Sequence, residues 1–286
     1  SAYNSMRKHK GSYMDLNQNV NENVDTGTLR IHLTNESNGT PVQGAKISIS
    51  YTGNPSQTIV EVSADDSGNS EELTLNAPPL EYSMEPSEEQ PYAEYTIRVQ
   101  APGYRDITVS AINVLPREAA IQNVRMEAED APGGRIDTVV IAAHTLYAEY
   151  PPKIPEEEIK PMNESGEIVL SRVVIPEYIV VHDGAPGDTT ASDYYVRYRD
   201  YIKNVASSEI YATWPDATIR ANVLAIMSFT LNRVYTEWYR GKGYNFTITS
   251  STAYDHKFIY GRNYFQSISR VVDEMFENYL SRPNVR

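Results

Sequence analysis

The chain has 286 residues, a net charge of −13 and no cysteine. Its acidity argues against nucleic acid or an anionic membrane surface as a partner, and no apolar run is long enough to span a bilayer. Without cysteine the chain forms no disulfide and performs no thiolate chemistry, which leaves its compartment open. At this length we expect two domains.

The front of the chain predicts a polar tail followed by a sandwich of strands. Residues 1–25 are polar, and residues 1–15 lack the apolar stretch of a signal peptide. Residues 26–130 then alternate apolar and polar side chains between turn residues, as in Leu29, Ile31 and Leu33. Similar alternation recurs at 47–49, 73–75, 95–99, 107–112 and 121–126. We therefore predict an antiparallel β-sandwich, with the acidic stretch 81–94 as a long exposed connection.

The motif of this region is P-V-x-G-A-x-I-x-I, then D-x-x-G, then Y-x-I-x-V-x-A-P-G-Y. It resembles the carboxypeptidase-regulatory (transthyretin-like) sandwich. The resemblance covers the whole predicted domain and implies a module without catalytic activity.

Residues 131–166 are rich in proline and glutamate and predict a linker, with a strand or buried segment at 136–144. The second domain, 167–286, is expected to open with strands at 167–175 and 178–182. A short helix is predicted at 196–206, a long one at 216–240 and a last one at 264–280. Pro215 and Asp216 suit the start of the long helix, and Gly241 and Gly243 suit its end.

Glu209 lies in or just after the short helix, beside small hydroxyl side chains and ahead of an aromatic–proline turn. An average glutamate is a solvated surface acid. A glutamate held among apolar walls instead has a raised pKa and can donate a proton. The residues alone leave both interpretations open.

The run DYIKNVASSEIYATWPDATIRANVLAIMSF resembles the signature of the stage II sporulation protein D family. The whole chain resembles the clostridial spore-cortex-lytic enzymes of the SleC type, which place a β-rich pro-region before a related catalytic domain. The resemblance implies an α+β protein whose sandwich is linked to the first, mainly helical part of a sporulation protein D-like domain. It also implies the precursor of a peptidoglycan lytic transglycosylase used in germination, in the spore cortex, the coat region or the extracytoplasmic wall.

The resemblance assigns the acid/base role to Glu209. One carboxylate suffices in this reaction because the muramic acid 6-hydroxyl attacks within the substrate, whereas ordinary glycosidases use two. The expected substrate-binding residues are Ser208, Tyr211, Trp214, Arg220, Ser228, Tyr254 and Tyr260. The tyrosines of this domain could stack on saccharides or simply pack at helix surfaces. We expect no metal and no cofactor.

Three departures from the family pattern weaken the resemblance. The family arginine is Met227 here, the cysteine of some members is absent, and the chain ends at Arg286 before the later part of the catalytic domain. The expected partners are peptidoglycan glycan strands, a processing protease acting on the linker and a C-terminal partner segment. A catalytically inactive spore-wall binding or structural protein is the main alternative, and a general carbohydrate adhesin is another.

Overall fold

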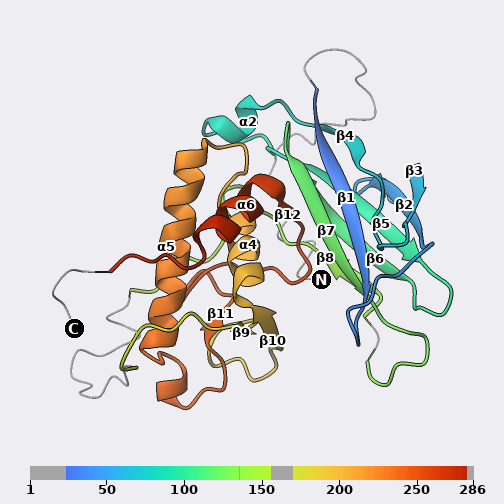
Figure 1. Ribbon diagram of the computed structural model, residues 1–286. Helices are drawn as coiled ribbons and strands as arrows, with labels where there is room; N and C mark the ends of the chain where they lie inside the picture. The colour runs from blue at the N-terminus through green and yellow to red at the C-terminus, as the bar shows by residue number, and fades with distance from the viewer. Residues whose placement is uncertain (1–23, 135, 156–169, 282–286) are drawn as a thin grey trace. The chain divides into compact units, whose positions relative to one another are not determined.

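The computed structural model describes residues 24–134, 136–155 and 170–281 (Figure 1). Within these residues the fold is mixed α+β, with several sheets and few helices. The chain forms two compact units. Unit 1 comprises residues 1–143 with two later segments, 211–214 and 260–267. Unit 2 comprises the remaining parts of the chain, 144–210, 215–259 and 268–286. The chain therefore enters each unit more than once.

Unit 1 is built from two packed sheets, with strand orders β12-β7-β1-β4 and β3-β2-β5-β6-β8. β6 contacts β1, β4 and β7 of the other sheet, and Figure 1 shows the two sheets as separate layers. The strands are β1 (Asp25–Asn35), β2 (Lys46–Tyr51), β3 (Thr58–Ser63), β4 (Leu73–Ala77), β5 (Ala93–Gln100), β6 (Ile107–Val114), β7 (Ala119–Met126), β8 (Thr138–Val140) and β12 (Tyr264–Phe265).

Side-chain alternation explains why these strands form. Leu29, Ile31 and Leu33 of β1 are fully buried, while the residues between them are more exposed. Every strand that the alternation predicted is present, which confirms this part of the prediction. The expectation of a wholly antiparallel sandwich is wrong at two pairs, because β1–β7 and β6–β8 are parallel.

Two connections of unit 1 differ from their sequence predictions. The stretch 81–94 contains the short helix α2 (Glu81–Met84) and the start of β5, and Tyr92 within it is buried. It is therefore not simply an exposed loop. The first residues of the predicted linker belong to unit 1, because β8 pairs with β6.

Unit 2 combines a three-stranded sheet, in the order β10-β9-β11, with helices. Its elements are β9 (Tyr178–His182), β10 (Asp193–Arg197), α4 (Tyr198–Glu209), α5 (Asp216–Tyr235), the 3-10 turn η1 (Arg240–Lys242), β11 (Ile248–Thr249) and α6 (Gln266–Met275), whose first two residues are grouped with unit 1. The strand predicted at 178–182 is confirmed. The one predicted at 167–175 is wrong for 170–175, which are not extended in a sheet, while 167–169 lie outside the described residues.

Each predicted helix is present with different boundaries. α4 runs from Tyr198 to Glu209 where 196–206 was predicted, and α6 ends at Met275, five positions before the predicted end at 280. α5 begins at Asp216 as expected but ends at Tyr235, five positions before the predicted end at 240. Glu237 has a φ of 45°, which leaves the helical region, and this turn buries Trp238 and Tyr239. The helix predicted from 264 begins at Gln266, because the two preceding residues form β12 on the edge of β7.

Candidate functional site

Glu209 is the last residue of α4. This helix packs through Tyr201, Ile202 and Val205, which are fully buried. Its next residue, Ile210, is extended and donates its N–H to the carbonyl of Ala206, which ends the helix. A carboxyl group at this end faces the negative pole of the helix dipole, where its charged form is disfavoured.

The Glu209 carboxyl is partly buried and receives one main-chain hydrogen bond. The backbone N–H of Lys257 donates to its Oε1 at 2.8 Å. Burial raises the pKa of Glu209 above its ordinary value, while the Lys257 hydrogen bond and the nearby Lys153 ammonium act in the opposite direction. Among the described residues no hydrogen bond to Oε2 is present. A carboxyl group with a raised pKa keeps its proton to higher pH than an ordinary glutamate does.

Asp255 holds the loop that carries Lys257. Its carboxylate accepts four hydrogen bonds. The donors are Arg233 Nε at 2.8 Å, the Tyr239 hydroxyl at 2.6 Å, and the N–H and hydroxyl of Thr249 at 3.0 and 2.7 Å. The Asp255 and Arg233 side chains are 0% and 2% exposed. Four donors on one buried carboxylate fix the loop two residues before Lys257.

The Phe229 ring of α5 contacts one imidazole and two cationic side chains within the same unit. Its ring centroid lies 4.5 Å from that of His256, 4.4 Å from the Arg233 guanidinium and 4.6 Å from Lys153 Nζ. Burial lowers the pKa of His256 to about 3, so the imidazole is neutral near pH 7 and cannot serve as a proton donor there. Of these two groups, the Glu209 carboxyl is therefore the one suited to proton transfer.

Residues 144–155, which we call the strap, come from the predicted linker and pack within unit 2. The Thr145 N–H and hydroxyl donate to the carbonyl of Ser208 at 3.0 and 3.1 Å. Ile154 N–H donates to Ala253 O at 2.8 Å. The strap brings Lys153 near Glu209, although nothing in a proline-rich linker pattern indicated a functional side chain.

Four of the predicted substrate-binding residues lie in unit 2. Ser208 is fully buried, and its hydroxyl donates to Asn204 O at 2.8 Å, as part of the helix packing. The Ser228 hydroxyl donates a hydrogen bond to Leu224 O within α5 and accepts one from the N–H of Leu280. Tyr254 is half-buried in the loop that leads to Asp255. Arg220 is held by ion pairs, as described below.

The other three, Tyr211, Trp214 and Tyr260, belong to unit 1. Trp214 donates its Nε1 hydrogen to Ser83 O at 2.9 Å and meets the Tyr211 ring edge-on at 5.9 Å. Tyr260 is 36% exposed. Their role in substrate binding stays a prediction, as does that of the four in unit 2.

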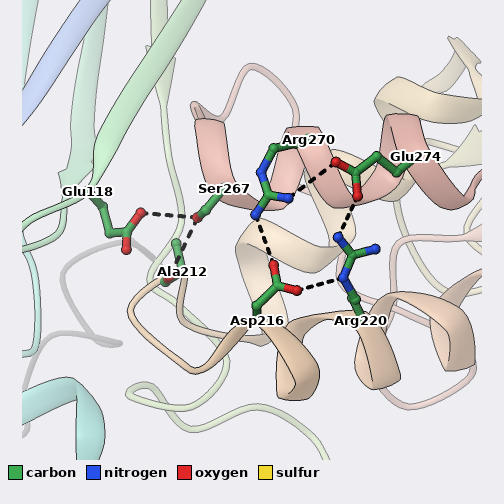
Figure 2. Close-up of polar contacts among 7 residues, drawn as sticks. All are labelled: Glu118, Ala212, Asp216, Arg220, Ser267, Arg270 and Glu274. Atoms are coloured by element: carbon green, nitrogen blue, oxygen red, sulfur yellow. Dashed lines mark hydrogen bonds and ion pairs between the residues drawn. The ribbon is translucent and has the colours of Figure 1, made fainter.

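Figure 2 shows two further polar groups. In unit 2, Asp216 and Glu274 alternate with Arg220 and Arg270 in a ring of ion pairs that joins α5 to α6. These hydrogen bonds lower the pKa of both carboxyl groups. The ring keeps the Arg220 guanidinium engaged with protein carboxylates.

In unit 1, the Ser267 hydroxyl donates to Glu118 Oε2 at 3.0 Å and lies 3.5 Å from Ala212 O (Figure 2). Burial raises the pKa of Glu118 to about 7, against a smaller opposing effect of the Ser267 hydrogen bond. No sequence pattern singled out this glutamate, which follows an ordinary-looking Pro-Arg turn.

Among residues 24–134, 136–155 and 170–281, no cluster of three or more histidine, aspartate or glutamate side chains is placed to hold a metal ion. In the same part of the chain no helix combines the length and the apolar character needed to cross a membrane.

No family model matches the chain, and no curated protein matches it. Several solved structures are similar to part of it. The Bacillus anthracis TIE protein is 22% identical, over 36% of this chain and 17% of its own, with a TM-score of 0.25. Klebsiella pneumoniae 5-hydroxyisourate hydrolase is 19% identical, over 37% of this chain and 92% of its own, with a TM-score of 0.23. The Streptococcus agalactiae minor pilin GBS52 is 13% identical, over 39% of this chain and 48% of its own, with a TM-score of 0.27.

Proposed function

We propose that unit 2 cleaves the glycan strands of peptidoglycan, as a lytic transglycosylase with Glu209 as its single acid/base. The observation that supports this most is the environment of that carboxyl. It stands at the C-terminal end of α4, burial raises its pKa, and it receives one main-chain hydrogen bond, from Lys257. A general acid needs this combination of retained proton and fixed position.

The reaction would use Glu209 twice. The protonated carboxyl donates its hydrogen to the glycosidic oxygen while the bond from that oxygen to the anomeric carbon breaks. The 6-hydroxyl of the same muramic acid residue attacks the anomeric carbon and closes an anhydro ring, and the carboxylate takes up the hydroxyl proton. The Lys257 N–H and the Lys153 ammonium stabilise the carboxylate between these steps. The proton balance closes without a second carboxylate.

The rest of the proposal follows the family resemblance. Unit 1 would be a sandwich of the carboxypeptidase-regulatory or transthyretin-like type without catalytic activity, and unit 2 would be the first part of a sporulation protein D-like domain. The precursor would act on the spore cortex during germination, in the cortex, the coat region or the extracytoplasmic wall. A processing protease would cut the joint between Met126 and Glu177, and a C-terminal partner segment would supply the remaining residues of the substrate cleft.

The test is digestion of purified spore cortex peptidoglycan, with the soluble fragments analysed by mass spectrometry. Wild type should release anhydro-muramic ends, and Glu209→Gln should release about a hundredfold to ten-thousandfold less, the usual contribution of a general acid. Asp273→Asn, a surface change on α6, is the matched control and should release as much as wild type. Equal release by wild type and Glu209→Gln would rule out the assignment.

A second candidate is a catalytically inactive protein that binds or structures the spore-wall peptidoglycan. Met227 favours it, because the residue in place of the family arginine is fully buried and cannot contact a substrate. In that case the chain would sediment with insoluble cortex and release no fragments.

A further inference from the structure

The sheet of unit 1 is completed by a strand from the far end of the chain. β12 pairs antiparallel with β7, with Tyr264 opposite Ile121 and Phe265 opposite Ala120. Phe265 is 1% exposed. Without this segment, β7 would present an open edge with unpaired N–H and C=O groups.

Buried side-chain amides hold the residues just before β12. Asn113 N–H donates to Asn263 Oδ1 at 3.1 Å, and Asn263 Nδ2 donates to Asn113 O at 2.8 Å. Arg262 donates to Asn113 Oδ1 at 3.0 Å, and Gln122 Nε2 donates to Gly261 O at 2.9 Å. Asn113 and Asn263 are at most 1% exposed. Removal of the 260–267 segment would leave those of these groups that stay buried without hydrogen-bond partners, which is costly.

A second segment of the later chain, 211–214, also belongs to unit 1. The Thr213 hydroxyl donates to the Ser83 hydroxyl at 2.8 Å, and Trp214 Nε1 donates to Ser83 O at 2.9 Å. The earlier part of the chain likewise contributes a segment to unit 2, because the strap (144–155) packs there. His144 Nε2 lies 3.1 Å from Ile210 O, and the strap also bonds Ser208 and Ala253.

We propose that a cut in the joint at 156–166 does not separate the chain into free pieces. The front piece binds segments 211–214 and 260–267 of the rear piece, chiefly along the β7 edge, and the rear piece binds the strap of the front piece. The front piece thus stays bound to the rear piece as a non-covalent subunit after processing, and it does not leave as a released pro-domain. This inference does not depend on the lytic activity, since it concerns only how the pieces are held.

The experiment replaces residues 160–166 with a site-specific protease sequence of the same length in the full chain. After complete cleavage, shown on a denaturing gel, the two pieces should elute together from a gel-filtration column at the volume of the uncut protein. Elution as two separate species at micromolar concentration would overturn the proposal.

Asn263→Ala in the same cleavable chain tests whether the β7 edge carries the attachment. It leaves the buried N–H and C=O of Asn113 without hydrogen-bond partners, so the dissociation constant of the cut pieces should rise by about a hundredfold. Asn232→Ala, an exposed change on α5, is the matched control and should leave it unchanged. Equal constants for the two variants would contradict the assignment.

A cross-link test works even if Asn263→Ala fails to fold. The chain has no cysteine, so Ile121→Cys with Tyr264→Cys introduces the only thiols. Paired positions on neighbouring strands lie within disulfide range. The cut pieces should therefore run as one band without reductant, whereas Ile59→Cys with Tyr264→Cys, from the other sheet, should give two. Failure of the first pair to cross-link would overturn the proposal.

Discussion

The backbone N–H of Lys257 donates a hydrogen bond of 2.8 Å to the carboxyl group of Glu209, 48 positions earlier in the chain. A main-chain donor carries no titratable charge, so it orients the carboxyl at every pH. It also stabilises the charged form that remains after proton donation. The network around Asp255 holds this donor in place, because Asp255 fixes the loop two residues before Lys257.

Asp255→Asn is expected to lower the free energy of unfolding by about 3–5 kcal/mol, because it leaves the Arg233 guanidinium buried without a counter-charge. Urea denaturation measures the change. Glu177→Gln is the control, since its ion pair with Arg197 is exposed on both sides, at 72% and 62%, and should contribute below about 1 kcal/mol. Similar losses for the two variants would show that the Asp255 network does not stabilise the unit.

Lys153→Met should raise the pKa of Glu209 further, because the Lys153 ammonium favours the charged carboxylate. The proposed reaction needs the protonated carboxyl, and activity is lost as the pH rises through its pKa. The alkaline limb of the pH–rate profile should therefore move to higher pH in Lys153→Met and stay in place in Lys153→Arg. An unchanged limb in the methionine variant would mean that the strap does not tune the acid.

Glu118 should make folding stability depend on pH. Burial raises its folded-state pKa from the ordinary value of 4.5 to about 7. Between these values the folded state retains a proton that the unfolded chain has lost, so the free energy of unfolding falls as the pH rises from about 4.5 to about 7. A fully buried group would lose about 3 kcal/mol, and solvent screening reduces this to on the order of 1–2 kcal/mol.

Urea denaturation across this pH window compares wild type with Glu118→Gln, which should remove this component of the pH dependence. Ser267→Ala removes a hydrogen bond that lowers the pKa of Glu118, so it should extend the fall in stability to higher pH. A Glu118→Gln profile identical to that of wild type would refute the assignment.

Arg220→Gln opens the ring of ion pairs between α5 and α6. The melting temperature should fall more at low than at high ionic strength, because salt already screens these exposed charges in the wild type. Thermal melts at two salt concentrations measure the difference. A loss independent of salt would point to packing by the arginine stem instead.

Most of the fold could be predicted from local patterns. The burial of Leu29, Ile31 and Leu33 follows directly from alternation, and the start of α5 follows from Pro215 and Asp216. The end of α5 could not be predicted, because it depends on the Tyr239 hydroxyl reaching Asp255. β12 was missed because two residues before a helix carry no strand periodicity, and only β7 makes them a strand.

Glu209, the acid of the candidate site, could be predicted from the sequence, but the residues that surround it could not. The sequence singled out Glu209 through its small neighbours and the family resemblance. Its closest partners come from distant segments: Lys257 acts through a main-chain N–H that no residue pattern marks, and Lys153 comes from a stretch with linker composition. Such contacts depend on tertiary packing, which single-sequence periodicity does not contain.

The most direct measurement is the titration of the Glu209 carboxyl by ¹³C NMR, with its resonance assigned by its disappearance in Glu209→Gln. The predicted midpoint lies above the ordinary glutamate value of 4.5. A midpoint at or below that value would mean that the group gives up its proton as readily as a surface acid, which would contradict its role as proton donor.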